Sequence, residues 1–279
     1  MQGKTVVITG ATSGIGAVAA RRLAERGARI IFVARDRQRA EQTLRALRTA
    51  NPAAAHSAHF ADLSRLRDMK RVAAEIAAAE SSIDVLINNA GAIAARNQLT
   101  EDGLGVMFAT NHMSYFVITN LLLERLRAVA GGARIVCTAS AAHQRARLDF
   151  EHLQDQKGYT GYGTTKLCNI LFTRELARRI AGSGVTASCL HPGFVATRFG
   201  DGAGGPIRLG IAIAKRLFAL SPEEGAKTMV YLASSPEVEG RSGGYYSQCA
   251  PEVPSAQAQS DENARRLWEL SARIAETGG

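Results

Sequence analysis

The sequence predicts an α/β protein with a doubly wound parallel sheet and helices on both faces. Over the first 200 residues, short apolar runs alternate with amphipathic stretches of helical length. The apolar runs are continuous, as in strands that are buried on both faces. The 279 residues hold no internal repeat and no Pro-rich linker, so we expect a single domain over residues 1–279.

The expected strands and helices follow one another in regular order. The strands are the runs K-T-V-V-I-T-G (4–10), A-R-I-I-F-V-A (28–34), H-S-A-H-F (56–60), I-D-V-L-I (83–87), A-R-I-V-C-T (133–138) and V-T-A-S-C-L (185–190). Helical patterns lie between them, from Gly14 to about Arg26, after the second strand, and at 64–80, 100–129 and 160–181. Gly27 is placed to end the first helix, because glycine is favoured just past a helix C-terminus.

Residues 199–220 differ from this alternation. F-G-D-G-A-G-G-P (199–206) is typical of a loop, and the apolar and basic run after it is typical of a short amphipathic helix. We interpret 199–220 as a loop or small lid over a substrate pocket. A helix on a membrane surface at 206–219 is the alternative, although its apolar residues do not form one stripe.

The chain is expected to end in a helix. Residues 251–260 have a loop composition, and Ser260 and Asp261 are placed to cap a helix over 260–276. The apolar residues expected on its buried face are Leu267, Trp268, Leu270 and Ile274.

The composition is that of a globular α/β protein with a basic surface. The formal net charge is +9, but the basic residues are scattered along helices and only 6% of residues are aromatic. We therefore expect no nucleic-acid partner, and an attraction for an anionic cofactor. No uninterrupted apolar run reaches membrane-spanning length, and the N-terminus has no signal-peptide layout. The four cysteines lack metal-ligand spacing, so we predict reduced thiols, no metal site and a cytoplasmic location.

The run T-G-A-T-S-G-I-G (9–16) joins the first strand to the first helix. Glycines permit a sharp turn and the close approach of a ligand, and a helix N-terminus offers free N–H groups to a pyrophosphate. This context predicts a nucleotide cofactor, with contacts from Gly10, Thr12, Ser13, Gly14, Ile15 and Gly16.

The end of the second strand predicts which dinucleotide binds. Ala34 stands where an acidic residue would bind the adenosine ribose of NAD, and Arg35 follows it. Because Arg suits a phosphate on that ribose, NADP is favoured over NAD. Asp36 leaves an alternative: it would bind the ribose if the strand ended two residues later, and otherwise it caps the next helix.

The run Y-G-T-T-K (162–166) begins an amphipathic helical pattern, so Tyr162 and Lys166 lie four residues apart on one face. A nearby cation favours phenolate and lowers the pKa of a tyrosine, which would let Tyr162 exchange a proton. The alternative is a packed tyrosine beside a solvated lysine.

Six motifs stand in order along the chain: T-G-A-T-S-G-I-G (9–16), N-N-A-G (88–91), Asn111, Ser140, Y-G-T-T-K (162–166) and H-P-G (191–193). In this order they resemble the short-chain dehydrogenase/reductase family. Other runs, among them L-D-F-E-H-L-Q, H-P-G-F-V-A-T and A-R-R-L-W-E-L-S, resemble its retinol dehydrogenase-like branch. The resemblance covers nearly the whole chain and implies a Rossmann-type fold.

The resemblance also implies roles for individual residues. Tyr162 is expected to donate and accept a proton, and Lys166 to lower its pKa and to bind the nicotinamide ribose. Ser140 is expected to hydrogen-bond the substrate oxygen, and Asn111 to hold a water in the proton relay. The further cofactor contacts that it implies are Asp62, Leu63, Asn88, Ala90, Gly91, Pro192, Gly193, Val195 and Thr197.

The chain departs from the family pattern in two places. Ser13 stands where many NADP-using relatives carry a second basic residue, which leaves Arg35 alone, and Ala139 replaces the first of a common pair of serines. The long segment between Ser140 and Tyr162 is expected to border the substrate pocket. His112 has no role that the sequence assigns, and the other histidines are expected to be structural.

These observations predict an NADP(H)-dependent oxidoreductase that interconverts a carbonyl and an alcohol on a bulky apolar substrate. The alternative is a redox sensor that binds NADP without turnover, for which the Ser–Tyr–Lys–Asn set would be unnecessary. From the resemblance we also expect a homodimer or homotetramer that pairs through 100–129 and 160–181.

Overall fold

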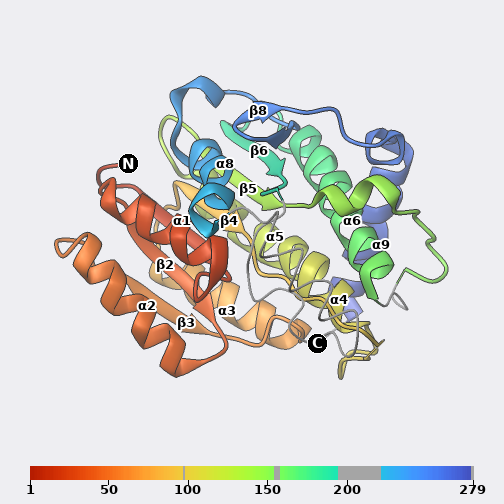
Figure 1. Cartoon of the computed structure of the whole chain (residues 1–279), viewed down its shortest axis with the longest axis horizontal. Coiled ribbons are helices and arrows are strands. Elements are labelled where there is room, and N and C mark those ends of the chain that lie inside the picture. Colours follow the sequence, from red (N-terminus) through yellow and green to blue (C-terminus); the bar gives the residue numbers. More distant parts are fainter. Residues whose placement is uncertain (97, 154–157, 194–220, 278–279) are drawn as a thin grey trace.

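The computed structural model describes residues 1–96, 98–153, 158–193 and 221–277. Its centre is an eight-stranded sheet with the order β3-β2-β1-β4-β5-β6-β7-β8 (Figure 1). Neighbouring strands pair in parallel, except that β7 and β8 are antiparallel. The strands are β1 (Thr5–Thr9), β2 (Arg29–Ala34), β3 (Ser57–Phe60), β4 (Val85–Asn88), β5 (Ala133–Thr138), β6 (Val185–Leu190), β7 (Tyr245–Ser247) and β8 (Ala250–Pro251).

The predicted doubly wound parallel sheet is confirmed. Each of the six predicted strands corresponds to one of β1 to β6. The sequence interpretation missed β7 and β8, which together make a short hairpin at the edge of the sheet. The positive φ angles of Gln248 (49°) and Cys249 (62°) form its turn, and neither residue is a glycine that would have signalled one.

The helices are α1 (Gly14–Glu25), α2 (Arg37–Ala50), α3 (Leu66–Ala79), α4 (Val106–Phe108), α5 (Ser114–Arg127), α6 (Gly158–Arg179), α8 (Pro222–Ser234) and α9 (Asp261–Thr277). The helix predicted at 100–129 begins only at Val106 and contains a π-helical turn, Ala109–Met113, between α4 and α5. Helix α8 was missed, although Ser221 caps it by accepting the backbone N–H of Glu224 at 3.2 Å. Gly27 follows the C-cap residue of α1 and has a φ of +91°, so it terminates this helix as predicted.

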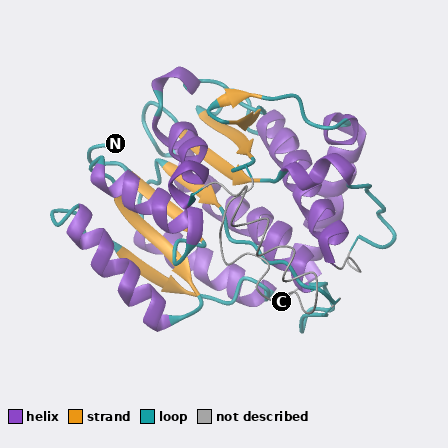
Figure 2. Ribbon diagram, viewed as in Figure 1, coloured by secondary structure: helices purple, strands orange, loops and turns teal. Residues whose placement is uncertain are grey.

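Helices cover both faces of the sheet (Figure 2). Along β1, Val6 and Ile8 join the apolar cluster beneath α1, α2 and α8, whereas Val7 joins the cluster beneath α3, α5 and α6. Successive side chains of a strand point to opposite faces, so a continuous apolar run supplies both layers.

Helix α9 lies against the outer side of α6 (Figure 1). The Trp268 ring stacks on the Phe172 ring, with centroids 5.8 Å apart and 12° between the planes, and meets the Phe116 ring edge-on at 4.9 Å. Asp261 pairs with Arg174 at 3.1 Å and with Arg178 at 3.0 Å. The helix predicted at 260–276 thus corresponds to α9, Asp261–Thr277, which covers one side of α6.

The expected pairing of chains through 100–129 and 160–181 is not tested by a single chain and stays a prediction. Because α9 covers the outer side of α6, any pairing on that side of the molecule would involve α9 as well.

One helical stretch in the described residues, Val106–Arg127, is long and apolar enough to cross a membrane by length and composition. Most of its apolar window, 72%, is buried inside the fold, where it packs on α3 and the sheet. Cys137, Cys168, Cys189 and Cys249 are free thiols, as predicted.

Candidate active site

The predicted site residues gather at the carboxyl edge of the parallel strands. The glycine turn follows β1, and β4 is its neighbour in the sheet, so the order of the strands reverses between them. In open α/β sheets, ligands bind at this kind of switch point. Asn88 ends β4 and Gly91 follows it, Ser140 follows β5, and Pro192 follows β6.

The turn after β1 requires its glycines. Gly10 and Gly14 have φ of +73° and +56°. A Cβ on Gly10 would lie 2.9 Å from the Cα of Ala90, and a Cβ on Gly16 would overlap the carbonyl oxygen of Gly10. The backbone of the turn at Gly10 is therefore in direct contact with the segment after β4, and α1 packs against Gly10 at Gly16. The absence of side chains at these two positions also lets a ligand approach the main chain of the turn.

The N-terminus of α1 is open to an anion. Ser13 stands at the N-cap, but its side chain makes no capping hydrogen bond, and the first turn contains no acidic residue. The first N–H groups of a helix have no partner within it, and their partial positive charge favours a phosphate. The cradle of Thr12, Ser13, Gly14 and Ile15 therefore fits the pyrophosphate of a dinucleotide.

Two residues that the sequence interpretation did not single out, Thr9 and Asn89, hold this cradle together. The Thr9 hydroxyl accepts the N–H groups of Asn89 and Ala90, each at 3.0 Å. The Asn89 amide donates to the carbonyls of Thr9 and Gly10, each at 3.1 Å. The two adjacent asparagines of N-N-A-G were the available signal in the sequence. Only the contacts across the sheet distinguish Asn89, which holds the turn, from Asn88.

The side chain of Asn88 faces away from the edge where a cofactor was expected. It is fully buried and donates to the Thr119 hydroxyl at 2.8 Å and to Cys137 Sγ at 3.7 Å. Asn88 therefore supports the end of β4 from inside. The cofactor contact of Asn88 stays a prediction, and because the side chain points toward α5, only its main chain is available for that contact.

The end of β2 falls at Ala34, as the NADP prediction requires. Asp36 caps α2 by accepting the backbone N–H of Arg39 at 2.8 Å, so the capping alternative for Asp36 is confirmed. The Arg35 side chain is exposed next to Ala34.

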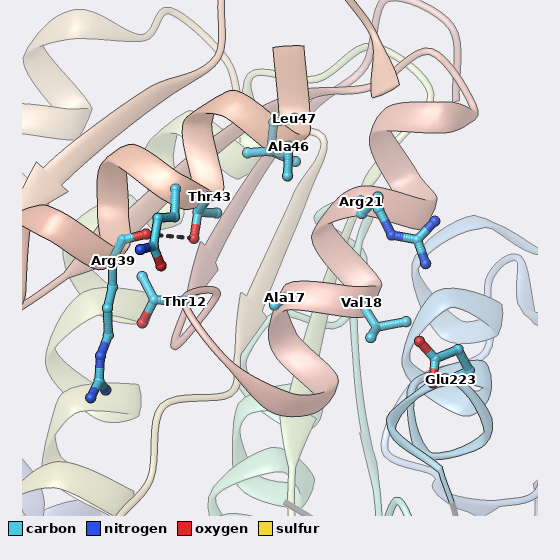
Figure 3. Close-up of a pocket in the computed structure, with 10 residues that line it drawn as sticks. Thr12, Ala17, Val18, Arg21, Arg39, Thr43, Ala46, Leu47 and Glu223 are labelled. Atoms are coloured by element: carbon cyan, nitrogen blue, oxygen red, sulfur yellow. Dashed lines mark hydrogen bonds between the residues drawn. The ribbon is translucent and has the colours of Figure 1, made fainter. Parts of the chain in front are cut away.

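A groove of about 260 Å³ lies between α1 and α2 beside the glycine turn (Figure 3). Thr12 and Arg39 line it, and the Arg39 side chain extends past Thr12. This corner of the site thus holds cationic groups on both Arg35 and Arg39.

Asp62 and Leu63 lie just past β3, at the same edge. The Asp62 carboxylate accepts the N–H and hydroxyl of Ser64 at 3.0 and 2.8 Å, and the Asp62 N–H donates to Asp68 at 3.0 Å. These bonds fix the turn in which an adenine contact was predicted.

The predicted catalytic side chains meet beside the end of β5. The Ser140 hydroxyl is close enough to Tyr162 to oppose the rise of the Tyr162 pKa, and Tyr162 is 9% exposed. The Lys166 ammonium lies 5.5 Å from the centre of the Tyr162 ring and 5.6 Å from that of the Tyr115 ring. Tyr162, Ser140 and Lys166 thus form one cluster, as the sequence predicted, and Lys166 is buried in it rather than solvated.

Lys166 is held by a backbone carbonyl. Its ammonium donates to the Thr138 carbonyl oxygen at 2.9 Å. The same oxygen accepts the Asn169 amide at 3.1 Å, and the Tyr115 hydroxyl lies 3.5 Å from it. A Cβ on Gly91 would lie 3.6 Å from Lys166 Nζ, so the ammonium sits under the segment that follows β4.

The pKa of Tyr162 is raised, not lowered by Lys166 as expected. Burial raises the pKa of Tyr162, and the hydrogen bond from Ser140 opposes this in part. Burial also lowers the pKa of Lys166 to about 7. The prediction was wrong because loss of solvation disfavours both charged forms, and because Lys166 faces the ring of Tyr162 rather than donating to its oxygen.

Asn111 lies in the π-helical turn and is fully buried. Its Oδ1 accepts the Ala92 N–H at 2.7 Å, and its Nδ2 donates to the Ala92 carbonyl and to the Thr165 hydroxyl, each at 2.9 Å. Asn111 therefore ties the segment after Gly91 to α6, one turn from Tyr162. Such π turns occur often at functional sites because they shift which side chains face inward.

An apolar wall borders Tyr162. Met107 and Ala142 form a small buried cluster with it, and the half-buried Ile93 and Ala94 pack against that cluster. The Tyr159 ring, 6.3 Å from the Tyr162 ring, is exposed on the outer side. The surroundings of the phenol are thus mainly apolar.

The segment after β6 closes the other side of the edge. Gly193 has φ of +79°, and its N–H donates to His191 Nδ1 at 3.1 Å, while His191 Nε2 lies 3.2 Å from Glu252. The interpretation of His191 as structural is confirmed. Val195 and Thr197, the lid at 199–220 and the alternative surface helix at 206–219 lie outside the described residues.

His143 is also structural, as expected. Its ring is fully buried, Nδ1 lies 2.7 Å from the Ser140 carbonyl, and Nε2 accepts the Ser255 N–H at 3.1 Å. The ring therefore carries its proton on Nδ1 and joins the strand end that bears Ser140 to the segment before α9.

The sequence of this chain is similar to those of known dehydrogenases. The family model described as short chain dehydrogenase matches residues 4–205. The chain is similar to retinol dehydrogenase 14 of Homo sapiens, at 40% identity over 97% of this chain and 86% of the relative. It is also similar to retinol dehydrogenase 13 of Homo sapiens, at 39% identity over 98% of this chain and 84% of the relative.

Solved structures share the fold. A putative uncharacterized protein from Mycobacterium Paratuberculosis has a TM-score of 0.78 at 33% identity, over 99% of this chain and 94% of that one. The RhlG/NADP active-site complex from Pseudomonas aeruginosa has a TM-score of 0.71 at 26% identity, over 88% of this chain and 94% of that one.

Proposed function

Because this chain belongs to the short-chain dehydrogenase family, we propose that it is an NADP(H)-dependent oxidoreductase that interconverts a carbonyl and an alcohol on a bulky apolar substrate. The observation that carries the proposal is the meeting of Ser140, Tyr162 and Lys166 at the same sheet edge as the open N-terminus of α1. A dinucleotide held there by its pyrophosphate would lie along the sheet edge at which Tyr162 stands, and its nicotinamide would supply the hydride chemistry.

The chemistry follows from what each side chain can give. When bound, the nicotinamide group supplies or accepts a hydride. Tyr162 donates its phenolic proton to the carbonyl oxygen, and Ser140 donates a hydrogen bond to the same oxygen as negative charge develops on it. The buried Lys166 ammonium lies close enough to stabilise the phenolate that remains. In the reverse direction, that phenolate accepts the proton of the alcohol.

The choice of NADP rests on the corner after β2. Ala34 leaves room for a phosphate, Arg35 is exposed beside it, and the Asp36 carboxylate is engaged as a helix cap. Arg39 supplies a second cation near Thr12. It could take the part of the basic residue that many NADP-using relatives carry at the position of Ser13. The similar RhlG structure is described as an NADP complex, which agrees with this choice.

The substrate class rests on the wall around Tyr162. Met107, Ile93, Ala94 and Ala142 offer apolar surface beside the phenol, and the curated relatives are named retinol dehydrogenases. We therefore expect an aldehyde, ketone or alcohol with a large hydrocarbon part rather than a small polar one.

The proposal is tested by following NADPH consumption with retinoid-like, steroid-like, aliphatic and aromatic carbonyl compounds, and NADP reduction with the matching alcohols. We expect turnover with at least one apolar carbonyl, and a faster rate with NADPH than with NADH. Tight NADPH binding without turnover of any compound would instead support a sensor that binds NADP.

A further inference from the structure

The hairpin of β7 and β8 forms the edge of the sheet beside β6 (Figure 1). It lies beyond residues 4–205, the part of the chain that the family model matches. Strand β7 pairs in parallel with the end of β6, and just past that end the His191 N–H donates to the Tyr246 carbonyl at 3.0 Å. The hairpin is therefore bonded directly to the segment that closes one side of the candidate active site.

The two ring nitrogens of His191 have different partners. Nδ1 accepts the Gly193 N–H at 3.1 Å, so this nitrogen carries no proton. Nε2 therefore carries the ring proton and donates it to the Glu252 carboxylate, with 3.2 Å between Nε2 and Oε2. Glu252 directly follows β8, and its N–H donates to the Tyr245 carbonyl at 2.8 Å. The one donor and the one acceptor of a neutral imidazole are thus both used.

The His191 ring is also held by packing. Its side chain is 13% exposed, and the ring stacks on the Tyr245 ring with centroids 5.8 Å apart and 27° between the planes. Turning the ring over would put the carbons Cδ2 and Cε1 in the places of Nδ1 and Nε2. Both hydrogen bonds would then be lost, so the observed orientation is the one that the surroundings favour.

A second histidine, His143, contacts the same Tyr245 ring edge-on, at 5.1 Å between centroids. Its Nδ1 lies 2.7 Å from the Ser140 carbonyl, and its Nε2 accepts the Ser255 N–H at 3.1 Å. Burial lowers the pKa of His143, so this ring is neutral and its proton is on Nδ1. The segment after β8 thus contacts both histidines, and the two rings have opposite tautomers.

Gly193 is one of the residues that we expect at the nicotinamide end of the cofactor. Its φ of +79° lies in the left-handed region, which glycine adopts without strain. Pro192, which comes between His191 and Gly193, has a fixed φ and no N–H of its own. The bond from the Gly193 N–H to the His191 ring therefore fixes the direction in which the main chain leaves the sheet edge.

We propose that Glu252 and His191 are positioning residues for the nicotinamide end of the cofactor: Glu252 binds the Nε2 proton of His191, and His191 Nδ1 in turn binds the Gly193 main chain. The proposal rests on the proposed function, since the nicotinamide is the group that this turn would face. Neither side chain is asked to touch the reacting atoms. A hairpin that the sequence did not predict thus takes part in shaping the active site.

The tautomer of His191 can be measured without cofactor or substrate. Nitrogen-15 NMR of the full-length protein labelled in histidine distinguishes Nε2–H from Nδ1–H, and His191→Asn identifies the signal. At neutral pH we expect Nε2–H for His191, with Nδ1–H for His143 as the internal reference. An Nδ1–H or doubly protonated His191 would overturn the proposal, whatever the protein does with NADPH.

The binding of two ligands separates positioning from general stability. NADPH contains the nicotinamide, whereas adenosine 2′,5′-bisphosphate has only the adenine end. In Glu252→Ala we expect the Kd of NADPH to rise about fivefold, as for the loss of one hydrogen bond, and the Kd of the bisphosphate to stay within about twofold. The Glu252 side chain is 39% exposed, so its truncation leaves no buried cavity. Glu252→Gln keeps an oxygen that can accept the Nε2 proton and should restore NADPH binding.

A double-mutant cycle tests whether Glu252 acts through His191. The side-chain oxygen of His191→Asn can accept the Gly193 N–H two residues on, as in an Asx-turn, without help from Glu252. Glu252→Ala should therefore have no further effect on NADPH binding in His191→Asn. Additive losses, or equal weakening of both ligands in Glu252→Ala, would overturn the proposal. Each of these results leaves NADPH binding and turnover by the native protein intact, so failure of the proposal is distinct from failure of the proposed function.

Discussion

Reversing the charge pattern after β2 should change which dinucleotide the protein prefers. In Ala34→Asp with Arg35→Ile, a carboxylate replaces the small residue at the end of β2, and the exposed cation beside it is lost. A charge-assisted hydrogen bond contributes about 1.5–3 kcal/mol, which corresponds to roughly 10- to 100-fold in affinity. Arg39 remains in the groove beside Thr12 and retains part of the attraction, so the lower part of this range is expected.

The assay is kcat/KM with NADPH divided by kcat/KM with NADH, and we expect this ratio to fall at least about tenfold. Asp36→Asn is the matched control, because asparagine caps a helix as well as aspartate but carries no charge. Since the Asp36 carboxylate is engaged with the Arg39 N–H at 2.8 Å, the ratio should be nearly unchanged in the control. A wild type that prefers NADH and loses that preference in Asp36→Asn would show that Asp36 binds the ribose.

Three further predictions concern pH and packing. Because burial raises the pKa of Tyr162, carbonyl reduction should be flat across neutral pH and alcohol oxidation should rise with pH; initial rates in both directions from about pH 6 to about pH 10 test this, and an oxidation rate that falls with pH would contradict it. Burial lowers the pKa of His112 to about 3, so its contribution to the free energy of unfolding is present above about pH 6.5 and is lost as the pH falls toward 3. Urea unfolding of the native protein at about pH 5 should therefore show a free energy of unfolding that is about 2 kcal/mol lower than at neutral pH. This loss should be absent in His112→Asn, and the same loss in that variant would refute the assignment. Trp268→Ala should lower the free energy of unfolding by about 3 kcal/mol, whereas Val253→Ala, at a side chain that is 75% exposed, should change it by less than about 0.5 kcal/mol; equal effects would mean that α9 does not hold α6.

The parts of the fold that sequence predicted are those that local patterns determine. Continuous apolar runs gave β1 to β6, and the glycine turn, Gly27 and the cap at Asp36 each follow from one residue's backbone preference or hydrogen bond. Helix α8 has a serine N-cap, Ser221, that the sequence could have revealed. It was missed because it lies after the first 200 residues, beyond the regular alternation of strands and helices. The hairpin of β7 and β8 has only five residues in its strands and no glycine in its turn, so pattern alone does not reveal it.

In the candidate site, residue types and their approximate neighbours could be predicted, but bonding and burial could not. Asn88 and Asn89 are adjacent and identical, and only the direction of each side chain across the sheet separates the buried one from the one that holds the glycine turn. The burial of Lys166 depends on Tyr115 and Thr138, which are 51 and 28 residues away in sequence. The link from Ser271 to His112 spans 159 residues, so no local pattern could have assigned His112 a partner.

The measurement that tests the acid–base role of Tyr162 most directly is turnover by Tyr162→Phe. The ring that packs against Met107 and Ala142 is kept, and only the phenolic hydroxyl is removed. NADPH fluorescence should show binding within about threefold of wild type, while kcat for an apolar carbonyl falls by roughly 10²- to 10⁴-fold, the usual effect of a general acid. A kcat near that of the wild type in this variant would contradict the proposed mechanism.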